Sequence, residues 1–321
     1  YPGFNGSYET PLAVNANEIY VLMVSNYAPG AGAGFSLSFT NSTCGIGAFT
    51  NGASILWTGA VSTDWSNAAN WSGCQVPSCS APETNAIIPA GYINPPTING
   101  NASCRNITIN AGATLTLGAT AVFGVCGDYN NQGNLVAQTG SRVIFEGPNT
   151  GSYPVSGIQS LDGNLSGTNG FHHIDVFKSN ITHHVNVNQD IDIKGDMHIG
   201  YRIPTGLTNT TSFFDVSGKY HKQGGHFRVF GGGGLASTYN PGSTLEFNGS
   251  ANQDYRNNGA VNSVFLNQSV ASTITLVNHT FATPYLNIST AGTLTFTQGK
   301  IVSPGGAQGY VNVQNNIAGA V

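Results

Sequence analysis

Short runs of alternating apolar and polar residues recur from about residue 85 to the end of the chain, separated by Gly, Asn, Ser or Thr. Alternation of this kind is typical of a strand that buries one face. The clearest examples are Cys104–Ile109, Ala113–Leu117, Ser141–Phe145, Ser243–Phe247, Ser272–Leu276 and Gly292–Phe296. Strands repeated about every ten residues, or in coils of about twenty, are typical of a solenoid, propeller or sandwich. The pattern therefore predicts a scaffold and says little about chemistry.

We expect an all-β chain in which residues 87–321 form a right-handed parallel β-helix, or β-solenoid. At about 22 residues per coil, this part contains roughly ten coils, with neighbouring strands about 4.8 Å apart. A stack of sandwiches is the competing fold. It would need Asn-Gly or Asp-Gly hairpin turns more often than the sequence offers them.

The first 86 residues differ from the rest. Residues 1–44 contain two expected strands, Glu18–Val24 and Gly34–Phe39. Two strands cannot make an independent sandwich, so this part is predicted to be a partial β-sandwich, the closing hairpin of a domain that begins upstream. Residues 45–86 have bulk without long strands and are predicted to be a Trp- and Cys-rich cap over the first coil. A solenoid needs such a cap because its terminal coil otherwise exposes core and backbone edges.

All three tryptophans, Trp57, Trp65 and Trp71, lie in the predicted cap. Exposed tryptophans could stack on sugars as a binding platform. Their regular spacing, together with Asp64 and Asn70, favours packing inside the cap instead.

The chain is poor in charge, with 10 Lys+Arg and 14 Asp+Glu among 321 residues and a net charge of −4. Only 7% of residues are charged, against a usual ~25%. There is no basic cluster, which argues against nucleic-acid binding. No apolar run approaches the ~20 residues that would span a bilayer, so we expect no membrane insertion. The five cysteines and the Asn- and Thr-rich strands suggest an exported protein in an oxidising space.

The spacing of the cysteines predicts two disulfides. Cys104 and Cys126 are about one coil apart, which would stack them on adjacent coils at a separation that a disulfide can bridge. Cys74 and Cys79 flank a short loop and are expected to close it as a local staple. Cys44 is left over, either free or paired outside this chain. A zinc site is not expected, because no CxxC pair is present.

Two clusters could bind metal. Asp190, Asp192 and Asp196 form an acidic cluster with Asp175 nearby, which makes them candidates for calcium or for acid–base chemistry in a β-helix polysaccharide lyase or hydrolase. The competing interpretation is the solvent face of an amphipathic strand, because Ile191 and Ile193 alternate with these acids.

The second cluster is rich in histidine. His172, His183 and His198 are candidates for a transition-metal site. Neighbouring residues in a strand point to opposite faces, which favours incidental surface histidines instead. No nucleophile elbow, zinc-protease motif, phosphate loop or dinucleotide fingerprint is present. We therefore expect no enzyme and no required cofactor, with calcium as the exception to be tested.

A family resemblance follows from motifs in the cap and the first coils. The motif from Trp57 through Trp65 and Trp71 to Pro77, and the run Cys104–Leu117, resemble the β-helical modules of large surface proteins of gliding, type IX-secreting Bacteroidota. In that family the chain normally continues past this point, so we expect a segment of a longer protein. The resemblance implies adhesins, gliding-motility filaments and other cell-surface proteins, and it supplies no catalytic residues.

From these observations we expect an extracellular structural or adhesive segment of a cell-surface adhesin or filament. Its expected partners are surface glycans, a host or substratum, other domains of the same long chain, or further filament subunits. A β-helix polysaccharide lyase or hydrolase and a carbohydrate-binding module are the alternatives. The enzyme requires a carboxylate cluster in a groove, and the binding module requires exposed aromatic side chains.

Overall fold

The computed structural model describes residues 50–146, 158–178, 184–202, 207–208, 213–215, 219–229, 234–235 and 244–247, together with the strands named below between 253 and 313. The chain divides into two units, Tyr1–Thr40 and Asn41–Val321. All described residues belong to the second unit. The predicted strands Glu18–Val24 and Gly34–Phe39, like Cys44, lie outside the described residues.

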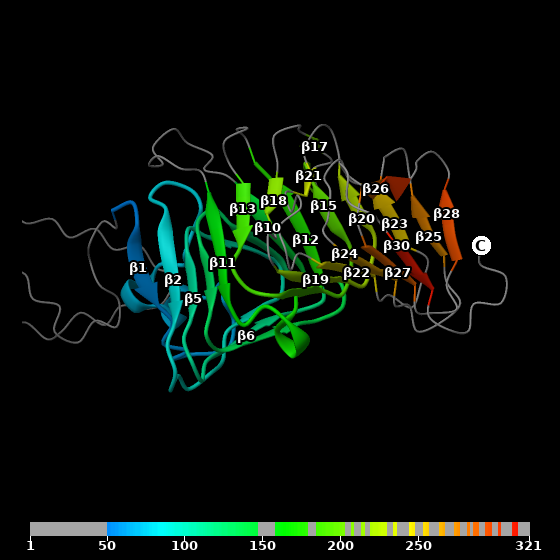
Figure 1. Cartoon of the computed structure of the whole chain (residues 1–321). Coiled ribbons are helices and arrows are strands. Elements are labelled where there is room, and N and C mark those ends of the chain that lie inside the picture. The colour runs from blue at the N-terminus through cyan, green and yellow to red at the C-terminus, as the bar shows by residue number, and fades with distance from the viewer. Residues whose placement is uncertain are drawn as a thin grey trace, which may run out of the picture. The chain divides into compact units, whose positions relative to one another are not determined.

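Two large sheets dominate the second unit (Figure 1). Sheet I has eight strands in the order β1 (Ala53–Leu56), β2 (Thr84–Ile88), β5 (Ile107–Ile109), β8 (Tyr129–Asn131), β11 (Gln159–Gly163), β13 (His184–Val187), β18 (Phe213–Asp215) and β21 (Gly234–Leu235). Sheet II has nine strands in the order β4 (Asn101–Cys104), β7 (Val122–Val125), β10 (Arg142–Glu146), β12 (His173–Phe177), β15 (Met197–Ile199), β20 (Phe227–Val229), β23 (Gln253–Arg256), β25 (Thr273–Leu276) and β28 (Thr293–Phe296).

Smaller sheets and short helices complete the described elements. Sheet III contains β14 (Ile191–Ile193), β19 (Tyr220–Gln223), β22 (Thr244–Phe247), β24 (Ser263–Leu266), β27 (Tyr285–Ile288) and β30 (Tyr310–Val313). Sheet IV contains β3 (Thr97–Ile98), β6 (Thr114–Leu117) and β9 (Asn134–Ala137). The remaining elements are the pairs β16 (Tyr201–Arg202) with β17 (Leu207–Thr208) and β26 (Phe281–Ala282) with β29 (Ile301–Val302), and the 3-10 helices η1 (Ala68–Asn70), η2 (Ser72–Cys74) and η3 (Gly167–Asn169).

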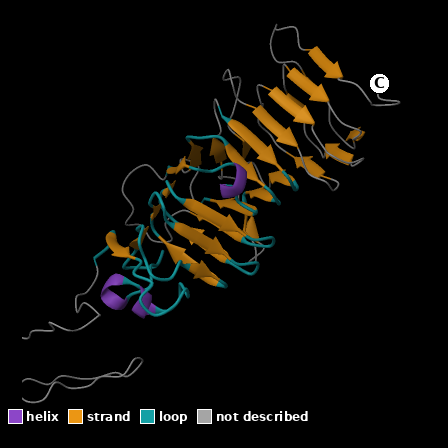
Figure 2. Ribbon diagram, turned by 90° about the horizontal axis from the view of Figure 1, so that it is seen from below, coloured by secondary structure: helices purple, strands orange, loops and turns teal. Residues whose placement is uncertain are grey.

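The chain visits the sheets in a repeating order. It runs from sheet I to sheet IV to sheet II and back to sheet I, as in β5, β6, β7 and β8. Sheet III takes the place of sheet IV from β14 onward, and from β22 the described strands of these sheets alternate between sheets III and II. We call one such passage a circuit. Every strand pair within the four sheets is parallel, and Figure 2 shows strands of successive circuits lying side by side. The all-β prediction is confirmed, since the helices of the described residues are three short 3-10 turns.

The core follows from the alternation along each strand. In β5, Ile107 and Ile109 are buried while Thr108 between them is half-exposed. Parallel register then places the buried positions of one circuit over the buried positions of the next, so that Ile107 pairs with Tyr129. Burying each such side chain stabilises the fold by roughly 1.5–3 kcal/mol. Stacking begins within the predicted cap, because β1 pairs with β2, and β2 pairs with β5.

Candidate functional sites

The three tryptophans form one buried cluster. Trp57, Trp65 and Trp71 are each 1% exposed. Trp71 meets Trp57 and Trp65 edge to face, at ring-centroid distances of 4.9 and 4.6 Å, and Trp65 also packs on Phe123. The indole N–H of Trp57 donates to the carbonyl oxygen of Asn94 at 2.7 Å. These rings cannot stack on a sugar, so a carbohydrate platform made of them is excluded.

Asn70 shapes the loop that carries this cluster. Its side chain is fully buried, and its Oδ1 accepts from the N–H groups of Val61 and Ser62 at 2.9 Å. Its Nδ2 donates to the carbonyl oxygen of Asp64 at 2.8 Å. A buried amide that makes these bonds satisfies backbone groups of a segment without regular strands.

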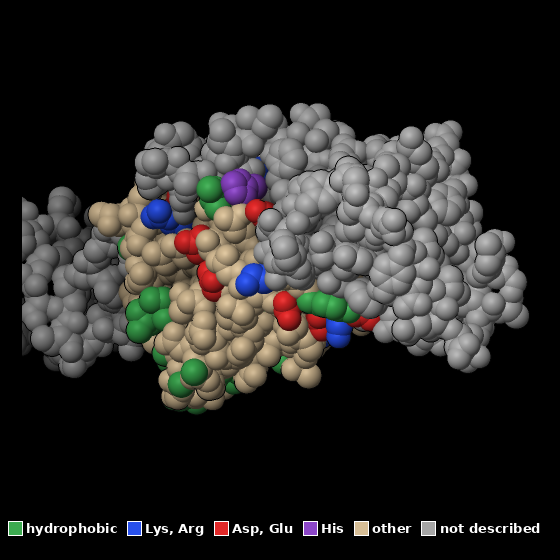
Figure 3. Space-filling view, in the orientation of Figure 1, with side chains coloured by type: hydrophobic (Ala, Val, Ile, Leu, Met, Phe, Trp, Pro, Cys, Tyr) green, Lys and Arg blue, Asp and Glu red, His purple; other side chains and the backbone are tan. Residues whose placement is uncertain are grey.

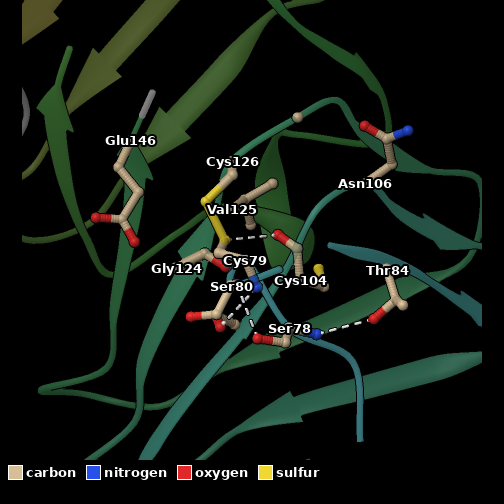
Figure 4. Close-up of a disulfide and its surroundings, with 12 residues drawn as sticks. Ser78, Cys79, Ser80, Thr84, Cys104, Asn106, Gly124, Val125, Cys126 and Glu146 are labelled. Atoms are coloured by element: carbon tan, nitrogen blue, oxygen red, sulfur yellow. Dashed lines mark hydrogen bonds between the residues drawn. A yellow bond between two sulfur atoms is a disulfide. The ribbon is translucent and has the colours of Figure 1, made fainter. Parts of the chain in front are cut away.

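The predicted cysteine pairing is wrong. Cys79 is bonded to Cys126, with a Cα–Cα distance of 5.9 Å, and Cys104 is a free, buried thiol (Figure 4). Cys74 is likewise in a disulfide, but not with Cys79. The Cys79–Cys126 disulfide therefore links residues 47 positions apart and does not close a short local loop.

Register explains the error. Cys104 pairs with Val125, which lies 21 positions on, and not with Cys126 at 22. A shift of one residue turns a side chain to the opposite face of a strand. Cys104 therefore points into the core at 0% exposure, and burial raises the pKa of its thiol. Cys126 is left to meet Cys79, whose N–H donates to Ser103 Oγ on the neighbouring strand.

Glu146 and the two cysteines beside it do not make a metal centre while the disulfide is formed. Cys79, Cys126 and Glu146 place their ligand atoms within 4.8 Å of one another. Within the described part of the chain they are the one such group of three. Two of the three are sulfur atoms of a disulfide, which lack the thiolate charge that binds metal. The Sγ of Cys79 also lies 3.0 Å from the carbonyl oxygen of Cys104.

The predicted acidic cluster is divided between two places. Asp196 lies just before β15, where its Oδ1 accepts from the N–H of His226 at 2.9 Å. Burial raises the pKa of Asp196, but this hydrogen bond and the nearby imidazoles of His226, His173 and His198 outweigh burial and leave the pKa below its usual value. Asp196 is therefore not part of a site with Asp190 and Asp192.

Asp190 and Asp192 instead line an open groove of about 650 Å³ beside β14, β19 and β22. Its full lining is Ser166, Gly167, Asp190, Asp192, Tyr220, Lys222 and Glu246. Figure 3 shows acidic and basic side chains close together on this face. Parallel register places Lys222 between Asp192 and Glu246 on three successive circuits.

Hydrogen bonds order the groove. Asp190 Oδ1 accepts from the Tyr220 N–H at 2.9 Å, and Asp192 Oδ2 accepts from the Gly167 N–H at 2.6 Å. Tyr220 Oη donates to Glu246 Oε2 at 2.6 Å. Burial, followed by this hydrogen bond and the charges of Glu246, Asp192 and Asp190, raises the pKa of Tyr220, so its hydroxyl stays protonated and remains a donor. The groove thus offers carboxylates, a phenol and one ammonium group, which are suited to hydrogen bonding with hydroxyl-rich molecules.

The predicted histidine site is not assembled by the residues that the structure describes. His172 Nδ1 accepts from the Gly140 N–H at 3.2 Å, and its ring packs on His173. His198 Nδ1 lies 3.1 Å from Asp175 Oδ1, in a network completed by the ion pair between Asp175 and Arg142. His183 lies outside the described residues.

Sequence reasoning missed two buried polar residues at the turn between sheets II and I. Lys178 follows β12 and is 0% exposed, and Gln159 begins β11 and is 2% exposed. No local signal marks them, because their contacts come from different circuits.

Comparison with known proteins gives one partial match. Residues 56–159 match a family model described as a domain of unknown function, DUF8693. The matched segment contains the tryptophan cluster and both cysteines of the Cys79–Cys126 disulfide. No curated protein and no solved structure matches the chain. Among the described residues, no helix is long and apolar enough to cross a membrane.

Proposed function

We propose that the chain is an extracellular structural segment of a cell-surface adhesin or filament, built as a right-handed parallel β-helix. The proposal rests on the parallel register, which is kept from one circuit to the next: Ala86 pairs with Ile107, and Ile107 pairs with Tyr129. Each circuit is hydrogen-bonded to both neighbours, which makes a stiff, extendable support. Parallel strands joined by crossover connections within one sheet are right-handed in ≈98% of cases, which favours that hand here.

Composition and cross-linking fit a location outside the cell. Disulfides persist in oxidising spaces, and the chain has Cys79 bonded to Cys126. With 7% charged residues, the surface depends little on charge pairs, so ionic strength should have little effect on its stability. The resemblance of the tryptophan motif to surface proteins of type IX-secreting Bacteroidota favours the same location. We propose surface glycans, a host or substratum, or other domains and subunits of the same assembly as its partners.

Electron microscopy of the native material, without reduction or tags, tests this proposal. We expect long fibres or stalks in which this chain is embedded or repeated, and labelling with an antibody against the chain should decorate them along their length. Discrete single particles that never assemble and carry no extended stalk would refute the structural role.

The groove favours a second candidate, polysaccharide binding or cleavage. Asp190, Asp192, Tyr220, Lys222 and Glu246 line it, and of these sequence reasoning singled out Asp190 and Asp192. Binding and product release from acidic and neutral polysaccharides should be measured with and without Ca²⁺. Asp192→Asn and Glu246→Gln should then abolish the activity.

Asp162→Asn is the matched control for the groove. Asp162 accepts a hydrogen bond from Asn188 at 2.9 Å and does not line the groove. Equal effects of Asp162→Asn and the two groove variants would refute a role for the groove.

A further inference from the structure

The turn between sheets II and I holds a buried amide in a fixed position. Gln159 Nε2 donates to the carbonyl oxygens of Val125 and Gly127 at 2.8 and 2.6 Å, both from the preceding circuit. The Gln159 side chain is therefore held over the turn that contains Cys126. Two hydrogen bonds to fixed backbone acceptors leave its carbonyl group oriented toward the following circuit.

Lys178 approaches this amide from the following circuit. Its Nζ is hydrogen-bonded to Gln159 Oε1 and donates to the backbone carbonyl oxygen of Glu146 at 3.4 Å. Burial lowers the pKa of Lys178 to about 7, against the opposing effects of the Glu146 and Asp128 carboxylates. A substantial fraction of Lys178 is therefore a neutral amine at neutral pH, which is the nucleophilic form.

The geometry puts the amine within reach of the amide carbon. A carbonyl bond is about 1.23 Å long, so a donor bonded to its oxygen lies within about 3–4 Å of the carbon. Reacting groups held about 3–3.5 Å apart reach effective concentrations of about 10⁵ M or more. Both side chains are almost fully buried, which excludes water as a competing nucleophile.

We propose that Lys178 and Gln159 become joined by an intramolecular isopeptide bond. Lys178 Nζ attacks Gln159 Cδ, the Nζ–Cδ bond forms, and the Cδ–Nε2 bond breaks. One proton moves from the neutral amine's Nζ to the departing nitrogen, which leaves as ammonia, and Nζ keeps its second hydrogen as the N–H of the new amide. Every atom is accounted for, and no oxidant or cofactor is needed.

Glu146 is the proton carrier in this proposal. It is 5% exposed, its charge acts on Lys178, and Figure 4 shows it beside the disulfide. A carboxylate in this place can accept a proton from the amine and deliver it to the leaving group.

The bond would continue a line of covalent links along one edge of the sheets. The disulfide ties Cys126, in the turn below Gln159, to the segment that carries Cys79. The isopeptide bond would tie the Gln159 circuit to the next one through Lys178. This inference stands on the local chemistry and does not depend on the proposed function.

Intact mass spectrometry of the purified, fully reduced chain tests the bond. We expect a mass lower than that of the sequence by one ammonia, and a chymotryptic fragment in which Lys178 and Gln159 are joined. The fragment is needed because succinimide formation at Asn-Gly also loses ammonia. A chain at its full sequence mass, with separate Lys178 and Gln159 peptides, would overturn the proposal.

Variants assign the roles. Lys178→Met should restore the full mass and abolish the joined fragment. Lys194→Arg is the control and should leave the fragment in place. Among the contacts described, Lys194 bonds only the Thr168 carbonyl oxygen. Glu146→Gln should slow bond formation by at least tenfold in freshly folded protein. If the joined fragment forms at the normal rate in Glu146→Gln, the proton-carrier role is refuted and the bond itself stands.

Discussion

Removal of the Cys79–Cys126 disulfide should destabilise the tryptophan-containing end of the stack by ~4 kcal/mol. The bond closes a separation of 47 residues, and the entropy that such a closure removes from the unfolded chain is worth ~4 kcal/mol at 25 °C. Because the two sulfurs join segments of different circuits, the loss applies to unfolding of the region between them. The change to make is Cys79→Ala together with Cys126→Ala.

The assay is urea unfolding followed by tryptophan fluorescence. The chain has only three tryptophans, all buried in the cluster of Trp57, Trp65 and Trp71, so this signal reports on the end of the stack that carries the disulfide. A loss of ~4 kcal/mol corresponds to about a thousandfold change in the unfolding equilibrium. Dithiothreitol should destabilise the unmodified chain by more than the double variant, and the difference isolates this bond from the disulfide of Cys74.

Cys104→Ala is the matched control, because it removes a buried sulfur without removing a disulfide. It should cost far less, and the Cys104 thiol should react with iodoacetamide only after unfolding. A double variant as stable as the unmodified chain would refute the entropy argument. A large dithiothreitol effect that requires Cys104 would refute the pairing.

Three further outcomes follow from buried groups. Trp65→Ala should cost ~3–5 kcal/mol in urea unfolding, since it removes the buried ring that packs between Trp71 and Phe123, and a cost below ~1 kcal/mol would contradict that packing. Arg142→Met should cost ~3 kcal/mol or more, because it leaves the buried Asp175 carboxylate without its guanidinium partner; adding Asp175→Leu should recover part of the loss. Burial lowers the pKa of His221 to about 4, outweighing its hydrogen bond with Gln223. The unfolded chain therefore binds a proton that the folded chain does not, and stability should fall as pH drops from about 6.5 to about 4. His221→Phe should flatten that slope, and an unchanged slope would exclude His221 as its source.

Local patterning was enough to predict the strands. The runs around Ile107–Ile109 and Thr114–Leu117 are strands in which apolar side chains are buried and alternate threonines are not. Alternation is a property of neighbouring residues, so the sequence contains it directly. The same reasoning correctly favoured burial of the tryptophans over a sugar platform.

Spacing along the sequence could not predict which circuits meet. Ile107 pairs with Tyr129 after 22 residues, but Tyr129 pairs with Leu161 after 32. Turn length varies from circuit to circuit, so no constant period gives the register. An error of one residue in the assumed register was enough to predict a disulfide between Cys104 and Cys126, although the two side chains belong to opposite faces of the sheet.

The groove and the buried amine depended on tertiary structure for the same reason. Glu246 comes close to Asp192 only because β19, which carries Lys222, pairs in register with β14 on one side and with β22 on the other. Lys178 meets Gln159 only because one circuit closes directly over another. The sequence by itself determined which residues form strands and which face of each strand is apolar, because both are local. Partners, burial of polar groups and disulfide pairing were decided by how one circuit lies on the next.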